Sequence, residues 1–104
     1  MEGIELICFQ IISSVGGARS SYIEAIQKAK AADFEGADAC MKEGAEMFHE
    51  GHHAHAQLIQ KEASGEENKI TLLLVHAEDQ LMSAEGFGIL AQEFIDLYKE
   101  VKSK

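Results

Sequence analysis

The chain has 104 residues, of which 46% are hydrophobic and 26% charged, and this size and composition fit one globular domain over residues 1–104. With no proline, no tryptophan and only five phenylalanines and two tyrosines, the composition favours an all-α protein over a β-sandwich or barrel. The formal net charge of −9 and a single arginine, Arg19, argue against binding to nucleic acid and to anionic membrane surfaces.

The beginning of the chain and its cysteines bear on the compartment. The first residues, MEGIEL, are acidic where a secretory signal has a basic segment, and no apolar run approaches the roughly 20 residues that a membrane helix needs. We therefore expect a cytoplasmic protein. Cys8 and Cys40 lack CxxC spacing and lie inside helical patterns, so we expect both to be small core residues.

A first amphipathic helix is predicted from residue 4 to about residue 30. Its apolar positions recur at steps of three and four: Ile4, Ile7, Ile11, Val15, Ala18, Tyr22, Ile26 and Ala29. Gly16 and Gly17 interrupt this pattern. Because glycine costs about 1 kcal/mol in a helix interior, the pair predicts either a bend or the close approach of another backbone.

A second helix is predicted after Asp33, ending near Gly65, which is a plausible C′ position. The apolar stripe expected to face the core is Phe34, Ala37, Met41, Ala45, Phe48, His52, His55, Ile59 and Ala63. The polar sequence SGEEN at residues 64–68 predicts a loop. Asn68 is the expected cap of a third helix, which should run from about Lys69 to Val101.

This third helix has two apolar faces on a helical wheel centred on Asp79. The face opposite Asp79 should pack in the core and consists of Ile70, Leu74, Ala77, Leu81, Ala84, Gly88, Ala91 and Ile95. The second apolar face surrounds Asp79 and consists of Leu72, Val75, Met82, Gly86, Leu90 and Leu97. A three-helix bundle covers only one of them, so the second apolar face predicts self-association, most simply with parallel third helices around a symmetry axis.

Asp79 lies in the middle of the second apolar face and would be buried wherever that face packs. A lone buried carboxylate costs several kcal/mol, so the group would be paired, protonated or bound to a hard cation such as Mg²⁺. Two other readings stay open: Asp79 faces solvent beside a merely hydrophobic surface, or it fixes the register of the assembly without a ligand.

His76 lies at the edge of the second apolar face, with Gln80 one turn further along the helix. We expect it to be partly exposed. A neutral imidazole there is able to act as a nucleophile toward a phosphoryl group, which needs little beyond alignment and charge-stabilising neighbours. Taken by itself, a single histidine on a helix is more often structural than catalytic.

A histidine cluster, HEGHHAH at residues 49–55, holds four of the five histidines and includes an HExxH match, typical of a zinc site. The match lacks a downstream completion and an obvious third ligand. His49 and His53 lie off the apolar stripe, which favours incidental metal binding at the surface. His52 and His55 lie on the stripe and are expected to face inward near an interface.

Four short motifs, by their order and spacing along the sequence, make the chain similar to the IIA component of the lactose/cellobiose branch of the bacterial phosphoenolpyruvate-dependent sugar phosphotransferase system. They are GGARS at 16–20, AADFEGA at 31–37, EASGEE at 62–67 and VHAEDQLM at 75–82, and the similarity spans essentially all 104 residues. The resemblance implies an antiparallel three-helix bundle that assembles as a homotrimer, with the third helices near the axis.

The resemblance also implies what the site residues do. His76 would accept a phosphoryl group from the phosphorylated histidine carrier protein and pass it to a cysteine of the cognate IIB component. Asp79 from each subunit would gather around one Mg²⁺ per trimer, and Gln80 is expected to support the phosphohistidine. The protein would have no substrate pocket of its own, and Met82 and Phe87 would suit contacts with the two partners.

The chain departs from the family pattern at four positions. The family commonly has Gln two residues and His four residues after the active histidine, where Glu78 and Gln80 stand here. The second helix commonly carries A-H-x-x-Q, where this chain has Gly51-His52-x-x-His55. These departures concern how a phosphohistidine is oriented. Cellobiose, chitobiose and lactose remain open as sugars, and a metal-binding bundle or a structural oligomeric module remain the alternatives to a phosphocarrier.

Overall fold

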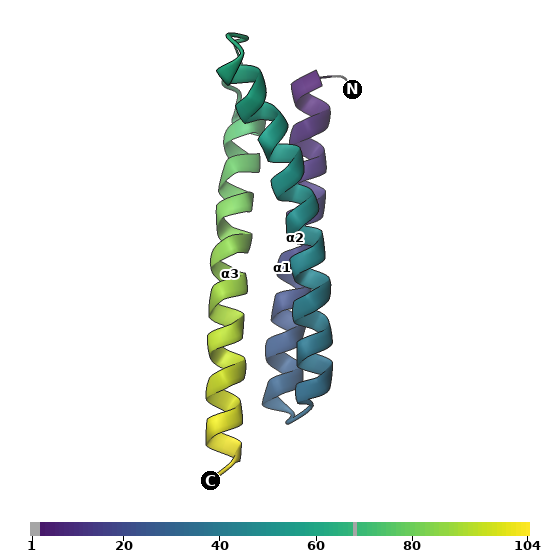
Figure 1. The fold of residues 1–104 in the computed structure, drawn as a ribbon, viewed down its shortest axis with the longest axis vertical. Coiled ribbons are helices and arrows are strands. Elements are labelled where there is room, and N and C mark those ends of the chain that lie inside the picture. The colour runs from purple at the N-terminus through teal and green to yellow at the C-terminus, as the bar shows by residue number, and fades with distance from the viewer. Residues whose placement is uncertain (1–2, 68) are drawn as a thin grey trace.

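The computed structural model describes residues 3–67 and 69–104, and it is a rod of three long helices, 56 Å by 20 Å by 20 Å (Figure 1). The helices are α1 (Gly3–Lys30), α2 (Phe34–Ala63) and α3 (Leu72–Lys102). α1 and α3 run in the same direction and α2 runs against both, and α1 packs more extensively on α2 and α3 than these two pack on each other. The predicted three-helix bundle is confirmed.

Short polar segments end the helices where the sequence indicates. Asp33 caps α2 by accepting a hydrogen bond from the backbone N–H of Gly36 (2.9 Å), and Ala32 adopts a left-handed φ of 65° in the preceding turn. Ser64 is the C-cap of α2, and Gly65 follows with φ of 94°, as expected for a C′ glycine.

The start of α3 differs from the prediction by about one turn. Its N-cap is Thr71, whose hydroxyl accepts from the backbone N–H of Leu74 (3.1 Å). Asn68, the predicted cap, lies outside the described residues. Ile70 was predicted to lie on the core face of the third helix. The helix begins only at Leu72, so Ile70 is outside it and is 80% exposed.

The core runs the length of α1, which supplies most of its large side chains. Ile11, Val15 and Cys8 are fully buried together with Ile95 of α3. Cys40 is buried as well, so both cysteines are core residues as predicted. Burial raises the pKa of the Cys8 thiol, and the nearby carboxylates of Glu78 and Glu5 raise it further.

The predicted core stripe of α2 is partly wrong. Ala45, His52, Ile59 and Ala63 are exposed, and the residues buried on this helix are Ala37, Cys40, Gly44, Gly51, Ala54 and Leu58. The two glycines explain the difference, since they have no apolar side chain to enter a hydropathy pattern. They lie on the buried face because bulky α1 side chains fill the space beside them: Val15 at Gly51 and Tyr22 at Gly44.

The Gly16–Gly17 pair was predicted to mark either a bend or the close approach of another backbone, and neither describes it fully. α1 continues through both residues without interruption. A Cβ on Gly17 would lie 2.9 Å from Met47 Sδ, so a side chain of α2, rather than a backbone, approaches there. A Cβ on Gly16 would have no atom within 4 Å.

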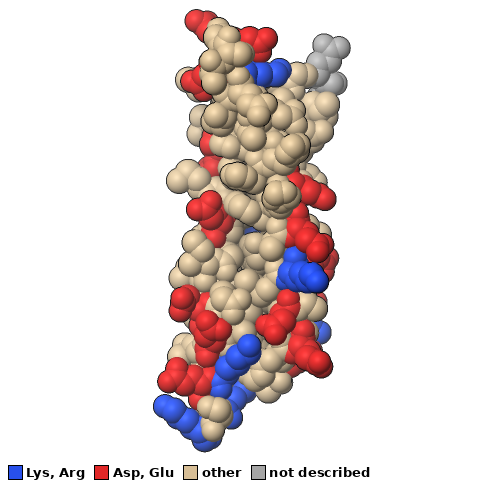
Figure 2. Space-filling model, in the orientation of Figure 1, with Lys and Arg blue, Asp and Glu red and all other residues tan. Residues whose placement is uncertain are grey.

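The surface of the rod is acidic, and α3 carries an uncovered apolar face. Figure 2 shows carboxylates spread along one face, with most of the visible basic side chains toward the end where the C-terminus lies. Leu72, Val75, Met82, Leu90 and Leu97, the large residues of the second apolar face, are between 51% and 85% exposed. Among residues 3–67 and 69–104, no helix has the length and apolar character required to cross a membrane.

Candidate functional site

His76 lies in the second turn of α3, on the part of the helix that Thr71 caps. Its side chain is exposed, as predicted, while its neighbour Ala77 is completely buried against α1 and α2. Ala77 therefore fixes the rotation of the helix and keeps the imidazole at the surface. In the described part of the chain no hydrogen bond or ion pair engages His76, so its ring nitrogens are available for chemistry.

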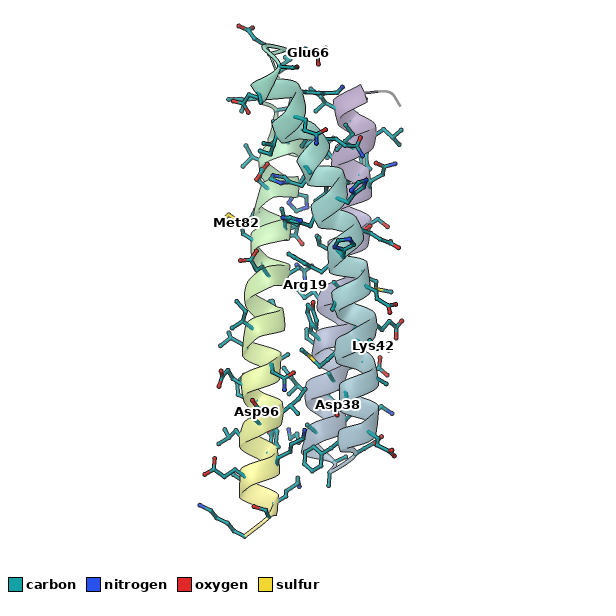
Figure 3. The ribbon with its side chains drawn as sticks, viewed as in Figure 1. Arg19, Asp38, Lys42, Glu66, Met82 and Asp96 are labelled. Carbon is teal, nitrogen blue, oxygen red and sulfur yellow. The ribbon has the colours of Figure 1, made fainter. Side chains whose placement is uncertain are left out.

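Asp79 also lies at the surface of the single chain, in the middle of the second apolar face. Within residues 3–67 and 69–104 it takes part in no hydrogen bond or ion pair. Met82, one turn further along, points away from α1 and α2 (Figure 3). The carboxylate thus stands alone among exposed apolar side chains, the arrangement that the helical wheel predicted.

Arg19 reaches across from α1 to the flank of α3 that carries His76. Its Nη1 donates to Gln80 Oε1 (2.6 Å) and lies 3.4 Å from Ser83 Oγ. All three side chains are partly buried, and Figure 3 places Arg19 in the space between α3 and the other two helices. The sequence indicated Gln80 as a supporting residue, but it did not indicate that the only arginine of the chain would bind it.

His55 of α2 and Glu78 of α3 form the second polar contact beside His76. His55 Nε2 lies 2.6 Å from Glu78 Oε1, and their side chains are 16% and 43% exposed. Both residues stand at positions where the family pattern commonly has glutamine. The two departures therefore meet in space and form one contact between α2 and α3, which the sequence alone did not reveal.

The rest of the histidine cluster does not form a site. His49, Glu50, His52 and His53 are exposed, and the ring of His52 stacks on Phe48 with centroids 6.2 Å apart. The inward orientation predicted for His55 is confirmed, and the one predicted for His52 is wrong. Across the described residues, no three His, Cys, Asp or Glu side chains come together in a way that would hold a metal ion.

The geometry around His76 suits a protein partner better than an enclosed substrate. A hollow between α2 and α3 is lined by Leu58, Leu74, Val75 and Glu78 among others, but His76 does not line it. The imidazole instead stands at the exposed surface of the rod, and Met82 and Phe87, further along α3, are exposed as well. An exposed neutral imidazole is able to attack an electrophile that a docked partner presents, with Gln80 one turn away as a hydrogen-bond donor.

Comparisons with known proteins agree along nearly all of the chain. The profile of the family described as "PTS system, Lactose/Cellobiose specific IIA subunit" matches residues 6–99. A lichenan-specific phosphotransferase enzyme IIA component of Bacillus subtilis is 45% identical over 100 residues, which are 96% of this chain and 91% of the relative. A lactose-specific EIIA component of Staphylococcus aureus is 35% identical over 98 residues, covering 94% of this chain and 95% of the relative.

Solved structures show the same fold. The crystal structure of the PTS cellobiose specific enzyme IIA from Bacillus anthracis superposes with a TM-score of 0.95 at 45% identity, covering 100% of this chain and 96% of that one. The IIA component in the solution structure of the IIA(chitobiose)–HPr complex of the Escherichia coli phosphotransferase system superposes with a TM-score of 0.84 at 32% identity. There the coverage is 98% of this chain and 99% of that one.

Proposed function

This chain belongs to the lactose/cellobiose-specific IIA subunits of the phosphoenolpyruvate-dependent sugar phosphotransferase system, and we propose that it is a phosphocarrier whose His76 takes up and passes on a phosphoryl group. The observation that carries the proposal is the exposed imidazole of His76, held outward by the buried Ala77 beside it. The donor is the phosphorylated histidine carrier protein, in keeping with the complex of a related IIA component with HPr. The acceptor is a cysteine of the cognate IIB component.

Two transfers make up the reaction. In the first, the unprotonated ring nitrogen of His76 attacks phosphorus, and the bond from phosphorus to the donor's ring nitrogen breaks with its electron pair remaining on that nitrogen. In the second, a thiolate of the IIB component attacks the same phosphorus, and the electron pair of the breaking P–N bond returns to His76. The protein contributes mainly alignment and charge stabilisation, the requirements of phosphoryl transfer.

The sugar transported is a β-linked disaccharide or oligosaccharide, within the range of cellobiose, chitobiose and lactose. Support comes from the names of the related proteins, which are specific for lichenan, lactose, cellobiose and chitobiose. Sugar recognition belongs to the membrane component of such a system, so the choice among these sugars is made outside this chain.

The test is phosphorylation by phosphoenolpyruvate in the presence of the two general proteins of the system. We expect one acid-labile phosphoryl group per chain, absent in His76→Gln. His53→Gln is the matched control, since it removes another exposed histidine of the chain and should leave phosphorylation unchanged. Full phosphorylation of His76→Gln, or its loss in His53→Gln, would show that the phosphoryl group is carried elsewhere.

The same proposal includes a homotrimer in which the second apolar faces of three α3 helices pack together. One chain leaves five large apolar side chains of that face more than half exposed, and three parallel copies would cover them. Asp79 from each copy would then meet at the axis. Its carboxylate oxygens suit Mg²⁺, whose two positive charges would offset most of the negative charge of the three groups, but one chain supplies only one such ligand.

Oligomeric state is measured by light scattering or native mass spectrometry over a concentration series. Leu97→Lys places a charge in the second apolar face and should dissociate the trimer, whereas Gln92→Lys adds the same charge on the polar side of α3 and should not. A monomeric wild-type protein would refute the trimer without affecting the assignment of His76.

A further inference from the structure

Arg19 is the only arginine in a chain of net charge −9, and it forms no ion pair within the described residues. Both of its side-chain contacts, Gln80 Oε1 and Ser83 Oγ, are neutral. Carboxylates are plentiful on this protein, so a partly buried guanidinium bound only to neutral acceptors keeps its positive charge uncompensated. Such a group is suited to an anion that is present only part of the time.

The contact with Gln80 also fixes which way the amide faces. A guanidinium donates hydrogen bonds and cannot accept one, so the Gln80 oxygen must face Arg19, and the NH₂ group must face away from it. His76 is four residues before Gln80 on the same flank of α3, a spacing that brings side chains within about 5–6 Å at their Cβ atoms. The free NH₂ donors of Gln80 are therefore close to any group that the His76 ring carries.

A phosphoryl group on His76 needs such help because two acidic residues follow it closely in the chain. Glu78 and Asp79 follow within three residues, and the phosphoryl group adds about 1.5 to 2 further negative charges. Glu78 is engaged by His55, but Asp79 has no partner in the described chain. Arg19 is the cation that reaches this part of α3 from α1, and hydrogen bonding to its charge polarises the Gln80 amide and strengthens the NH₂ group as a donor.

We propose that Arg19 is a positioning residue for the phosphorylated state: it holds Gln80 with the NH₂ group directed at the phosphoryl oxygens of His76, and its charge acts on them through that amide. This inference rests on the proposed function at His76. It predicts that the Arg19–Gln80 hydrogen bond matters for the transfer step itself, beyond any contribution to packing of α1 against α3.

The experiment measures kcat/KM for phosphorylation by the phosphorylated histidine carrier protein, together with the hydrolysis half-life of the phosphorylated product. Arg19→Met and Gln80→Ala should each lower kcat/KM about tenfold or more, the usual loss for one directed hydrogen bond to a charged group. The double variant should have a kcat/KM no lower than that of the more impaired single variant, because both changes remove the same interaction. Lys99→Met, which removes a cation near the far end of α3, is the control and should not change kcat/KM.

Gln80→Glu separates positioning from packing. A carboxylate at residue 80 keeps the bond to Arg19 and strengthens it, but it removes the NH₂ donors and places an acceptor toward the phosphoryl group. Thermal stability should be retained while phosphoryl transfer falls about as far as in Gln80→Ala. If the side chain of residue 80 does not face the phosphoryl group, Gln80→Glu should transfer at the wild-type rate, and that result would overturn the inference.

The outcomes also separate this inference from the proposed function. Phosphorylation of His76→Gln would refute both. If His76→Gln abolishes phosphorylation but Arg19→Met keeps the wild-type kcat/KM, only the role of Arg19 is refuted. The same conclusion follows if the losses in Arg19→Met and Gln80→Ala multiply in the double variant. Circular dichroism establishes that each variant folds, and if Arg19→Met does not fold, Gln80→Glu decides the question.

Discussion

The ring of Tyr22 is wedged between two glycines, and this arrangement yields a quantitative prediction. A Cβ on Gly44 of α2 would lie 2.6 Å from Tyr22 Cε1, and a Cβ on Gly88 of α3 would lie 2.9 Å from Cε2 on the other edge of the ring. Tyr22 is only 6% exposed. The ring is thus unable to move away from an added methyl group on one helix without approaching the other.

The perturbation is Gly44→Ala, with Gly16→Ala as the matched control. Overpacking a core costs about 1–3 kcal/mol, and the confined ring places Gly44→Ala in the upper half of that range. Replacing glycine by alanine in a helix recovers about 0.5–1 kcal/mol, so the net loss should be about 1–2.5 kcal/mol. Gly16→Ala has open space around the new methyl group and should gain about 0.5–1 kcal/mol. The two substitutions are chemically identical and should differ in sign.

The assay is thermal unfolding followed by circular dichroism at one fixed chain concentration, because the midpoint of an oligomer depends on concentration. For a chain of this size each kcal/mol shifts Tm by about 4–8 °C. In a Tyr22→Ala background, Gly44→Ala should no longer destabilise. If Gly44→Ala is as stable as Gly16→Ala in the presence of Tyr22, the ring is not confined and the packing argument is wrong.

Two further predictions concern pH and the start of α3. Because the pKa of Cys8 is raised in the folded protein, the unfolded chain loses the thiol proton first, so the free energy of unfolding should fall as pH rises above the ordinary thiol pKa of about 8.5. Denaturant titrations across that pH range should show a shallower decline of this free energy in Cys8→Ala than in the wild type. Equal slopes in the two proteins would contradict the prediction. Thr71→Ala removes the cap hydrogen bond to Leu74 and should cost about 1 kcal/mol, measured by urea unfolding, whereas Ser13→Ala on exposed helix surface should cost far less.

The site shows what a linear pattern is able to predict. The periodicity of α3 predicted the exposure of His76 and the isolation of Asp79 within the second apolar face, because both follow from the angle between side chains on one helix. The contacts of Arg19 with Gln80 and of His55 with Glu78 were not predicted. They join residues 61 and 23 positions apart, and which residues of two helices meet depends on their relative rotation and axial shift.

The sequence by itself determined three long helices, the residues that end them to within about a turn, and the presence on α3 of one more apolar face than a single chain covers. Only the tertiary structure decided which side of α2 is buried, where Tyr22 and Val15 pack against Gly44 and Gly51. Hydropathy records the character of each side chain, whereas burial on α2 depends on shape: the glycines make room for side chains of another helix, and no pattern within α2 contains that information.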